Sequence, residues 1–273
     1  MLVRILVVLI FGLFTSHAYA LRVISLSPYL TESLILLDAE DQLVGITANS
    51  RDMFGLENDV VGDTLNINIE KILSLNPDII LLTPMNKIGH IQKLDSLEID
   101  TEYFPMEETF EDCCDSFLRL GRLVGKEKKA LQIIKQEKNR LRNIGDVIAK
   151  TEAKRIFLEV GNTPLITAGG KCYLNELVSY AGAENVAEDI GERFFRIVRE
   201  RILELNPDYI IILSENSNVS LKQWMKFQFL KAVSDKNLII LSPDLFSRPN
   251  PVSFVNAVFV LAEHIYGDSW REN

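Results

Sequence analysis

Histidine, cysteine and an excess of positive charge are what this sequence has least of. The formal net charge is −9 and no basic stripe runs along any segment, which argues against nucleic acid as a partner. Only His90 and His264 lie beyond residue 20. A receptor for bare zinc or manganese draws histidine and carboxylate ligands from both sides of its site, so two histidines are too few for a direct metal site.

The three cysteines do not suggest a disulfide framework, because their number is odd. Side chains of adjacent helical residues point about 100° apart, so a bridge between Cys113 and Cys114 would need unusual geometry. We expect buried free thiols, while a bridge from Cys172 to one of the pair stays open. The cysteines give no support for a redox function.

Sequence motifs of the common enzyme classes are also missing. No GxGxxG segment follows a strand-like run, no GxSxG segment is present, and "AGGK" at residues 168–171 lacks the spacing of a phosphate loop. Aspartate and glutamate are plentiful but form no recognisable catalytic pair. The sequence therefore favours a binding protein with no cofactor, and an enzyme is the less favoured alternative.

The first twenty residues have the pattern of a cleavable export signal. Arg4 precedes an apolar run from Ile5 to Phe14, and a polar segment then ends in Ala18-Tyr19-Ala20. The run is short for a membrane span, so we expect cleavage after Ala20. Because no cysteine follows that site, a lipid anchor is not expected, and the periplasm is the natural compartment. No later segment is long and apolar enough to cross a bilayer.

Beyond residue 20 the chain alternates strand-like and helix-like segments in an α/β pattern. In residues 21–125, runs such as "RVISL" and "DIILL" are typical of buried parallel strands, and Ser27 is placed to cap a helix that Pro28 begins. Residues 126–150 carry apolar side chains at helical spacing on a charged segment without proline. That spacing predicts one long amphipathic helix.

The second half, residues 151–273, restarts the pattern. "GNTPLITAGGK", residues 161–171, is expected to be a loop, and "YLNELVSYAGAENV", residues 173–186, a helix ended by Gly182. The segment "IEKILSLNPDIILL" at 69–82 nearly recurs as "RERILELNPDYIII" at 199–212, an offset of 130 residues. One recurrence at a domain-sized spacing indicates two similar α/β lobes, with residues 126–150 between them.

These residues resemble the periplasmic binding proteins that serve ABC importers of cobalamin and ferric siderophores, and most of all the cobalamin-binding members. The resemblance rests on "RVISLSPYLTESLILLDAEDQLVGIT", on "VGD…NIEKILSLNPDIIL" and on "RIFLEVGNTPLITAGGKCYLNELVSYAGAENVAED", and it continues to "PDLFSRPNP". It implies an α/β fold of two Rossmann-like lobes joined by one long rigid helix, with a ligand in the cleft between them. It also implies a monomer that captures a small-molecule chelate and meets the membrane only through an ABC importer permease.

The resemblance assigns a role to the glutamates of the repeat. In this family one surface glutamate on each lobe docks the permease, and Glu70 and Glu200 occupy the matching places. Charge pairs at an interface rim steer encounter and fix register more than they add affinity. The alternative is that both glutamates only favour the N-terminus of a helix, by about 0.3–1 kcal/mol each.

Ligand-binding residues are expected in the loops that follow the strands, where open α/β sheets bind their ligands. By position these residues are Ser27, Tyr29, Asn49, Thr64, Thr83, Val160, Gly161, Phe194, Asp244, Phe246 and Arg248. Cobalamin-binding relatives carry an aspartate and an arginine at the places of Asp244 and Arg248, where they bind the polar rim of the ligand. An ion pair within the turn is the alternative reading of these two residues.

The identity of the ligand stays open from the sequence. Cobalamin-binding relatives line the cleft with tyrosine and tryptophan, whereas the matching places here hold Asn49, Thr64 and Thr83, and only Phe194 is aromatic. Arginines that could bind an anionic ferric siderophore are Arg51, Arg193, Arg196 and Arg248. The alternative functions are a ligand sensor or adaptor built on the same fold, a direct metal-ion receptor, and a two-lobed enzyme.

Overall fold

The computed structural model describes residues 21–149, 151–214 and 216–267. The predicted export signal, residues 1–20, lies outside the described residues. The elements of the first lobe are β1 (Val23–Ser25), α1 (Pro28–Leu36), β2 (Leu43–Ile46), α2 (Ala48–Phe54), α3 (Ile69–Ser74), β3 (Ile79–Leu82), α4 (Ile88–Asp95), β4 (Thr101–Tyr103) and α5 (Phe110–Leu123). Helix α6 (Glu127–Ile148) then leads to the second lobe.

The second lobe has a parallel sheet and a small antiparallel one. Its elements are β5 (Lys154–Glu159), β6 (Gly161–Asn162), β7 (Leu165–Ala168), α7 (Tyr173–Tyr180), β8 (Ala183–Asn185), β9 (Phe194–Arg196), α8 (Arg199–Leu205), β10 (Tyr209–Ile212), α9 (Ser217–Trp224), α10 (Lys231–Ser234), β11 (Leu238–Ile240), α11 (Pro243–Phe246) and α12 (Pro251–Tyr266). Among the described residues, no helix is long and apolar enough to span a bilayer.

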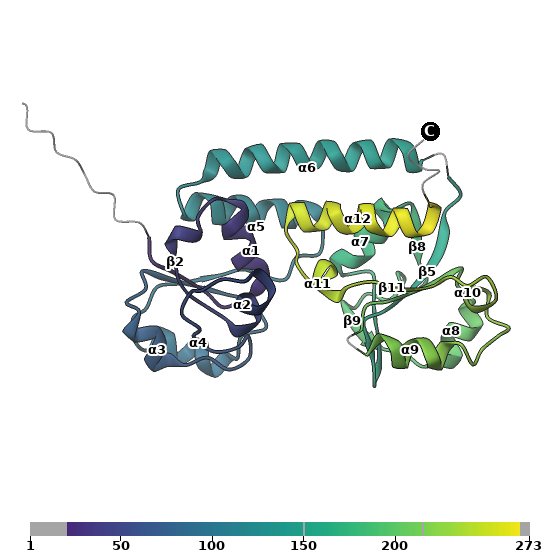
Figure 1. The fold of residues 1–273 in the computed structure, drawn as a ribbon, viewed down its shortest axis with the longest axis horizontal. Coiled ribbons are helices and arrows are strands. Elements are labelled where there is room, and N and C mark those ends of the chain that lie inside the picture. The colour runs from purple at the N-terminus through teal and green to yellow at the C-terminus, as the bar shows by residue number, and fades with distance from the viewer. Residues whose placement is uncertain (1–20, 150, 215, 268–273) are drawn as a thin grey trace, which may run out of the picture.

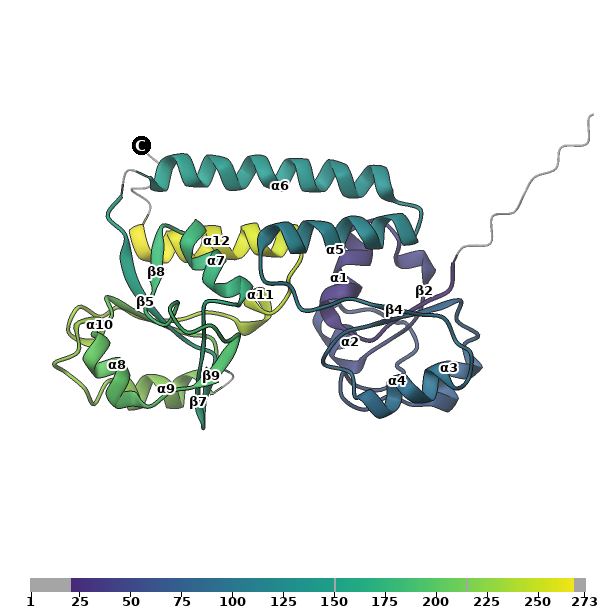
Figure 2. The same cartoon turned by 180° about the vertical axis from the view of Figure 1, so that it is seen from behind.

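The two parallel sheets have the same topology. The strand order is β2-β1-β3-β4 in the first lobe and β11-β10-β5-β8 in the second. In both sheets the four strands run parallel, and the chain connects them through helices that pack on the two faces. Figure 1 shows α6 running along one side of both lobes, and Figure 2 shows α5 and α12 between α6 and the sheets. The predicted fold of two α/β lobes joined by a long helix is confirmed.

The repeated "LNPD" segment forms a polar corner at the start of the third strand of the first lobe. The Asp78 carboxylate accepts a hydrogen bond of 2.7 Å from the backbone N–H of Arg22, just before β1. The Arg22 guanidinium in turn donates to the carbonyl of Leu75 at 2.6 Å. Asn76 follows the C-cap of α3 with a φ of 43°, a left-handed conformation that asparagine tolerates better than most residues. The corner joins two strands that are distant in sequence.

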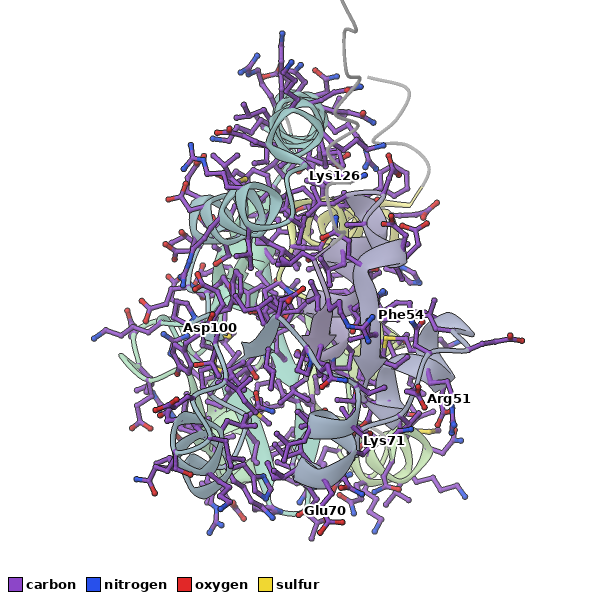
Figure 3. The ribbon with its side chains drawn as sticks, turned by 90° about the vertical axis from the view of Figure 1, so that its left-hand side faces the viewer. Arg51, Phe54, Glu70, Lys71, Asp100 and Lys126 are labelled. Atoms are coloured by element: carbon purple, nitrogen blue, oxygen red, sulfur yellow. The ribbon has the colours of Figure 1, made fainter. Side chains whose placement is uncertain are left out.

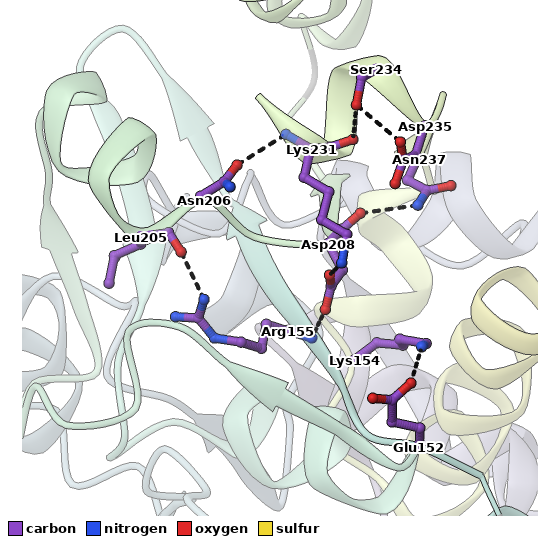
Figure 4. Close-up of polar contacts among 10 residues, drawn as sticks. All are labelled: Glu152, Lys154, Arg155, Leu205, Asn206, Asp208, Lys231, Ser234, Asp235 and Asn237. Atoms are coloured by element: carbon purple, nitrogen blue, oxygen red, sulfur yellow. Dashed lines mark hydrogen bonds and ion pairs between the residues drawn. The ribbon is translucent and has the colours of Figure 1, made fainter. Parts of the chain in front are cut away.

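The second lobe repeats this corner residue for residue (Figure 4). The Asp208 carboxylate accepts from the backbone N–H of Arg155 at 2.8 Å, and the Arg155 side chain donates to the carbonyl of Leu205 at 2.7 Å. Asn206 has a φ of 45°. Lys231 adds an ion pair with Asp208, at 2.5 Å, that the first lobe does not have at Asp78 among the described residues. The repeat therefore encodes a strand-pairing device used once in each lobe.

One hydrophobic cluster extends through both lobes beneath α6. It includes Leu34 and Phe117 from the first lobe, Leu141 and Ile144 from α6, and Leu174 and Phe254 from the second lobe. Smaller clusters cover the far face of each sheet, around Ile80 in the first lobe and around Phe157 and Trp224 in the second. Because the shared cluster contains side chains from both lobes, separating the lobes would expose apolar surface to water.

Helix α6 presents a continuous buried stripe to that cluster. Its buried residues are Ala130, Ile134, Glu137, Leu141, Ile144 and Ile148, spaced three and four residues apart. Glu137 is the one acid in the stripe, and Arg140 pairs with it at 2.6 Å while donating to Asn256 of α12 at 2.9 Å. At 1.5 Å per residue, 22 helical residues span about 33 Å, enough to cross both lobes.

Three local predictions differ from the structure. Residues 161–171 are not a loop, because β6 and β7 form a hairpin that β9 extends. The helix of the segment 173–186 ends at Tyr180, with the predicted terminator Gly182 directly after its C-cap at a φ of 72°, and residues 183–185 form strand β8 instead of continuing the helix. Ser27 occupies the N-cap position of α1, but its side chain makes no capping hydrogen bond. Strands of two to four residues carry too little alternation to be read from sequence.

The three cysteines are free and buried, as predicted. Burial raises the pKa of Cys172 to about 11 and that of Cys114 to about 12. Such thiols stay protonated at neutral pH, so they pack as small apolar side chains.

Gly182 should be irreplaceable, because its φ is +72° and an added Cβ would lie 1.9 Å from Cγ2 of Ile148. We expect Gly182→Ala to lower the free energy of unfolding by about 3 kcal/mol through backbone strain and overpacking. Gly145→Ala is the matched control, since it lies within α6 and a Cβ there meets nothing within 4 Å. It should raise stability by about 0.5–1 kcal/mol. Urea unfolding of both variants checks the prediction, and equal effects would contradict it.

Candidate functional site

A cavity of ≈660 Å³ lies between the two lobes. Its first wall includes the segments that follow β1, β3 and β4, and its second wall includes those that follow β5, β10 and β11. These are the carboxyl ends of parallel strands, where α/β sheets bind ligands. The volume falls within the range of small-molecule sites, roughly 300–1,000 Å³.

Most of the residues predicted for the cleft line this cavity. They are Ser27, Tyr29, Thr64, Thr83, Val160, Gly161, Phe194, Phe246 and Arg248. Asn49 and Asp244 do not line it: Asn49 lies exposed on α2, and Asp244 lies exposed on α11. Of the arginines considered for an anionic ligand, Arg193 and Arg248 line the cavity, whereas Arg51 and Arg196 do not.

A buried amide positions the wall of the first lobe. Asn86 accepts a hydrogen bond of 2.8 Å from the backbone N–H of Thr83 and donates to the carbonyl of Thr64 at 3.0 Å. It also reaches the carbonyl of Leu26, at 3.4 Å, after β1. One side chain therefore ties together three segments of the wall. Thr83 is 3% exposed, so this wall is rigid where it meets the cavity.

Aromatic side chains shape the wall of the second lobe. The Tyr173 hydroxyl donates to the carbonyl of Phe246, which joins the start of α7 to α11. Burial holds the pKa of Tyr173 well above its usual value, so this hydroxyl remains a donor. Phe194, at the start of β9, is 37% exposed and offers an aromatic face to a ligand.

Sequence reasoning missed the methionines of the cleft. Met53, Met85 and Met106 all line the cavity, together with Tyr173. Met85 follows β3 and Met106 follows β4, so the rule used for the threonines applied to them as well. Methionine adapts its shape to an irregular apolar ligand, which makes these side chains a flexible surface opposite the aromatic wall.

The ion pair within the Asp244 turn, the alternative reading of Asp244 and Arg248, does not form, because Arg248 pairs with Glu32 of the other lobe. The Arg248 guanidinium donates to the Glu32 carboxylate of α1, and to the Asp244 backbone carbonyl at 2.8 Å. Both partners of the ion pair are only 16% exposed. Glu32 also accepts from Asn250 at 2.6 Å and from Ser253 at 2.8 Å, both at the start of α12.

A second ion pair crosses between the lobes at Arg193. Its guanidinium contacts a Glu108 carboxylate oxygen at 2.7 Å and the backbone carbonyls of Met106 and Glu107 at 2.9 and 3.3 Å. Arg193 and Glu108 are 34% and 43% exposed, so the pair lies closer to solvent than the one at Glu32. The two cleft arginines therefore brace the lobes against each other.

Glu107 is a buried acid in the cavity wall. It is 3% exposed, one oxygen accepts from the Tyr29 hydroxyl at 3.4 Å, and the other has no partner among the described residues. Burial raises its pKa to about 7, although the hydrogen bond from Tyr29 opposes the shift. At neutral pH this carboxyl is partly protonated.

The two predicted docking glutamates are exposed at corresponding places of the lobes. Glu70 lies in the first turn of α3 and Glu200 in the first turn of α8, so the helix-terminus alternative is also consistent with their positions. Figure 3 shows Glu70 pointing outward at the lower edge of the molecule. Lys126, which directly precedes α6, lies in the upper part of the same view. Neither glutamate forms an ion pair with another described residue.

The described residues contain no group of three or more histidine, cysteine, aspartate or glutamate side chains placed to hold a metal ion. His90 lies within α4, and His264 bonds to the Val260 carbonyl of its own helix at 2.8 Å. The cavity instead presents apolar groups, hydroxyls and two paired arginines. It is suited to enclosing a sizeable organic ligand.

Comparison with known proteins places this geometry in a family. A family model described as "Periplasmic binding protein" matches residues 23–245. An uncharacterized ABC transporter substrate-binding lipoprotein of Bacillus subtilis is 30% identical over 92% of this chain and 82% of its own length. The vitamin B12-binding protein of Yersinia pseudotuberculosis is 32% identical, covering 91% and 88%. The structure of the periplasmic vitamin B12-binding protein of Vibrio cholerae superposes with a TM-score of 0.78 at 25% identity, covering 92% and 98%.

Replacing Glu107 by glutamine should change the dependence of stability on pH. An acid with a pKa of about 7 when folded and 4.5 when unfolded stabilises the fold below pH 4.5, and this contribution is lost as the pH rises through 7. Glutamine mimics the protonated acid, so Glu107→Gln should match the wild type near pH 4.5 and exceed it by about 3 kcal/mol at pH 8.5. Unfolding free energies across this range test the prediction, which parallel profiles would contradict.

Proposed function

The chain belongs to the periplasmic binding protein family, and from that membership we propose that it captures a corrinoid or a ferric chelate for import. As a member of the family it is a substrate-binding protein of an ABC transporter, acting outside the cytoplasm, and not an enzyme. A permease and a small-molecule ligand are therefore its partners.

The observation that carries the proposal is the cavity between the lobes. It is of ligand size, and its methionine, proline and aromatic side chains suit a large organic surface. The cobalamin bound by the vitamin B12-binding relatives is one such compound, and a siderophore wrapped around iron is another. Paired and buried polar groups at the cavity wall leave hydroxyls and carbonyls to orient the ligand. Use of the same site by a sensor or adaptor is the second candidate.

Ligand contact is proposed for Ser27, Tyr29, Thr64, Thr83, Val160, Gly161, Phe194, Phe246 and Arg248, since all nine line the cavity. Asn49 and Asp244 would reach a ligand only if it extended past the cavity, because both lie on neighbouring helices. The proposed units are lobes over residues 21–125 and 151–273, with a bridging segment over 126–150. Export through a signal at residues 1–20 to the periplasm, without a lipid anchor, is part of the proposal.

Docking to the permease is proposed for Glu70 and Glu200. They occupy equivalent turns of the two lobes, and neither is engaged by a described side chain. A pseudo-twofold protein that meets a twofold importer needs the same charged contact from each lobe, and exposed glutamates supply it.

The ligand class can be tested by thermal unfolding of the mature protein with cyanocobalamin, cobinamide, haemin and ferric siderophores. A true ligand at 100 times its dissociation constant adds about 2.7 kcal/mol, which raises Tm by roughly 5–10 °C for a chain of this size. Phe194→Ala should lower the affinity for that ligand three- to tenfold, because it removes an aromatic contact that contributes about 0.5–1.5 kcal/mol. Phe229→Ala, at a residue 72% exposed and outside the cavity, is the control. Chemical conversion of any bound compound would overturn the binding role.

Charge reversal at both docking glutamates should separate delivery from capture. In Glu70→Lys/Glu200→Lys, we expect uptake to fall to background while the dissociation constant of the ligand stays within twofold of wild type, because neither residue lines the cavity. Uptake would be measured in a deletion strain complemented with each variant. The control, Glu40→Lys/Glu127→Lys, makes the same change in charge at two other positions: Glu40 lies in the turn directly before β2, and Glu127 is the first residue of α6. Normal uptake in the first variant would refute the docking role.

A further inference from the structure

The cleft contains arginines, yet neither is free to bind an anion. Among the described residues that line the cavity, the charged ones are Glu107, Arg193 and Arg248. Each arginine belongs to the second lobe and is bound to a glutamate of the first. Two positive charges at the wall are thus neutralised by Glu108 and Glu32 before any ligand arrives.

The Arg248 pair is the harder of the two to break. Glu32 is held by Asn250 and Ser253 in addition to Arg248, and both charged side chains are 16% exposed. A ligand carboxylate that displaced Glu32 would leave a buried negative charge without its cation. Breaking a buried pair in this way makes the exchange strongly unfavourable. Arg248 therefore keeps Glu32 as its partner when a ligand binds.

Arg193 is also bound to groups of the first lobe, but it lies nearer to solvent. One terminal nitrogen bonds to two backbone carbonyls and the other to Glu108. The guanidinium is thus oriented toward the first lobe by three acceptors. Arg196, three residues further on at the end of β9, is exposed and does not line the cavity. Among the described residues that line the cavity, no other arginine or lysine is left to bind an anionic ligand in place of Arg193 and Arg248.

The remaining charge at the wall is negative. Once the two ion pairs cancel, the ionised fraction of Glu107 is left, and one oxygen of this partly protonated carboxyl has no hydrogen-bond partner among the described residues. A second anion placed beside this carboxylate would be repelled, and the net charge of the chain, −9, adds to the repulsion at long range. An uncharged or cationic ligand meets neither penalty.

We propose that Glu32 and Glu108 are specificity residues, which occupy Arg248 and Arg193 and so make the cleft selective for uncharged or cationic chelates over those that carry carboxylates. The proposal rests on the chelate-binding function proposed above and narrows it. Corrinoids fit this chemistry, because their peripheral side chains end in neutral amides and they carry no carboxylate; the single phosphodiester of cobalamin is balanced by the positive charge of its cobalt centre. Haem, with two propionates, and ferric citrate do not. The cleft discriminates against anionic ligands because it offers them no unpaired arginine and places Glu107 beside them. Specificity of this kind comes from unfavourable contacts with the wrong ligand.

The test is a titration calorimetry comparison of four probes: cyanocobalamin, which is uncharged; aquacyanocobinamide, a cation; haemin; and ferric citrate. We expect the wild-type protein to bind at least one corrinoid about a hundredfold more tightly than either anionic probe. In Glu108→Gln, Arg193 loses its counterion, so affinity for haemin or ferric citrate should rise about tenfold while corrinoid affinity stays within twofold.

Two further variants make the result interpretable. Glu111→Gln removes the same charge from α5, where Glu111 pairs with Lys138 at 2.6 Å outside the cavity, and it should change neither class of affinity. Glu32→Gln should act like Glu108→Gln on anions, but Glu32 is more buried and its loss can disturb folding. If Glu32→Gln fails to fold, the test rests on Glu108→Gln, because the Glu108 side chain is 43% exposed and its replacement disturbs folding less.

The outcomes separate this inference from the function on which it rests. Tighter binding of haemin or ferric citrate than of both corrinoids by the wild type would overturn the inference and leave chelate binding intact. The inference would also be overturned if Glu108→Gln bound all four probes with wild-type affinity, or if its affinity for corrinoids rose as much as its affinity for the anionic probes. Failure of the wild type to bind any of the four, or any ferric siderophore of the thermal screen, would refute chelate binding, and the inference with it.

Discussion

The carboxylate of Glu32 is the contact on which the arrangement of the two lobes depends. It projects from α1 of the first lobe and accepts hydrogen bonds from Arg248, Asn250 and Ser253 of the second. Asn250 caps α12 by accepting from the backbone N–H of Ser253, so the same residues set the start of that helix. Through α12, the contact reaches α6 and the shared hydrophobic cluster. The Glu32 carboxylate thus holds the start of α12 and the side chain of Arg248, and through them it sets the distance between the two walls of the cavity.

The shared cluster constrains how the protein exchanges ligand. Side chains of both lobes and of α6 form one apolar core, and two ion pairs join the lobes at the cleft. Wide opening would expose that core and break both pairs, so small movements of the cavity walls are the energetically accessible ones. The flexible part of the site is then the methionine surface formed by Met53, Met85 and Met106, which can repack around a ligand without moving the lobes.

Short-range patterns predicted the architecture well. The "LNPD" repeat, the stripe of residues 126–150 and the apolar strand runs are local signals, and each corresponds to an element of the structure. Nine of the eleven residues expected at the cleft line the cavity. Pairings between distant residues could not be read in this way. Glu32 and Arg248 are 216 residues apart, and nothing near Arg248 indicates a partner in the other lobe rather than Asp244. The hairpin of β6 and β7 was missed because its strands depend on β9 for support.

The bridging helix also determines which sequence changes this protein tolerates over evolution. Substitutions on the exposed face of α6 leave the buried stripe intact. An insertion or deletion of one residue within α6 would rotate everything beyond it by about 100° and shift it by about 1.5 Å, turning the stripe away from the core. The loops that surround the helix have no such periodicity. Variation in length among related chains should therefore gather in those loops, with the helix keeping a constant number of residues as the spacer of the molecule.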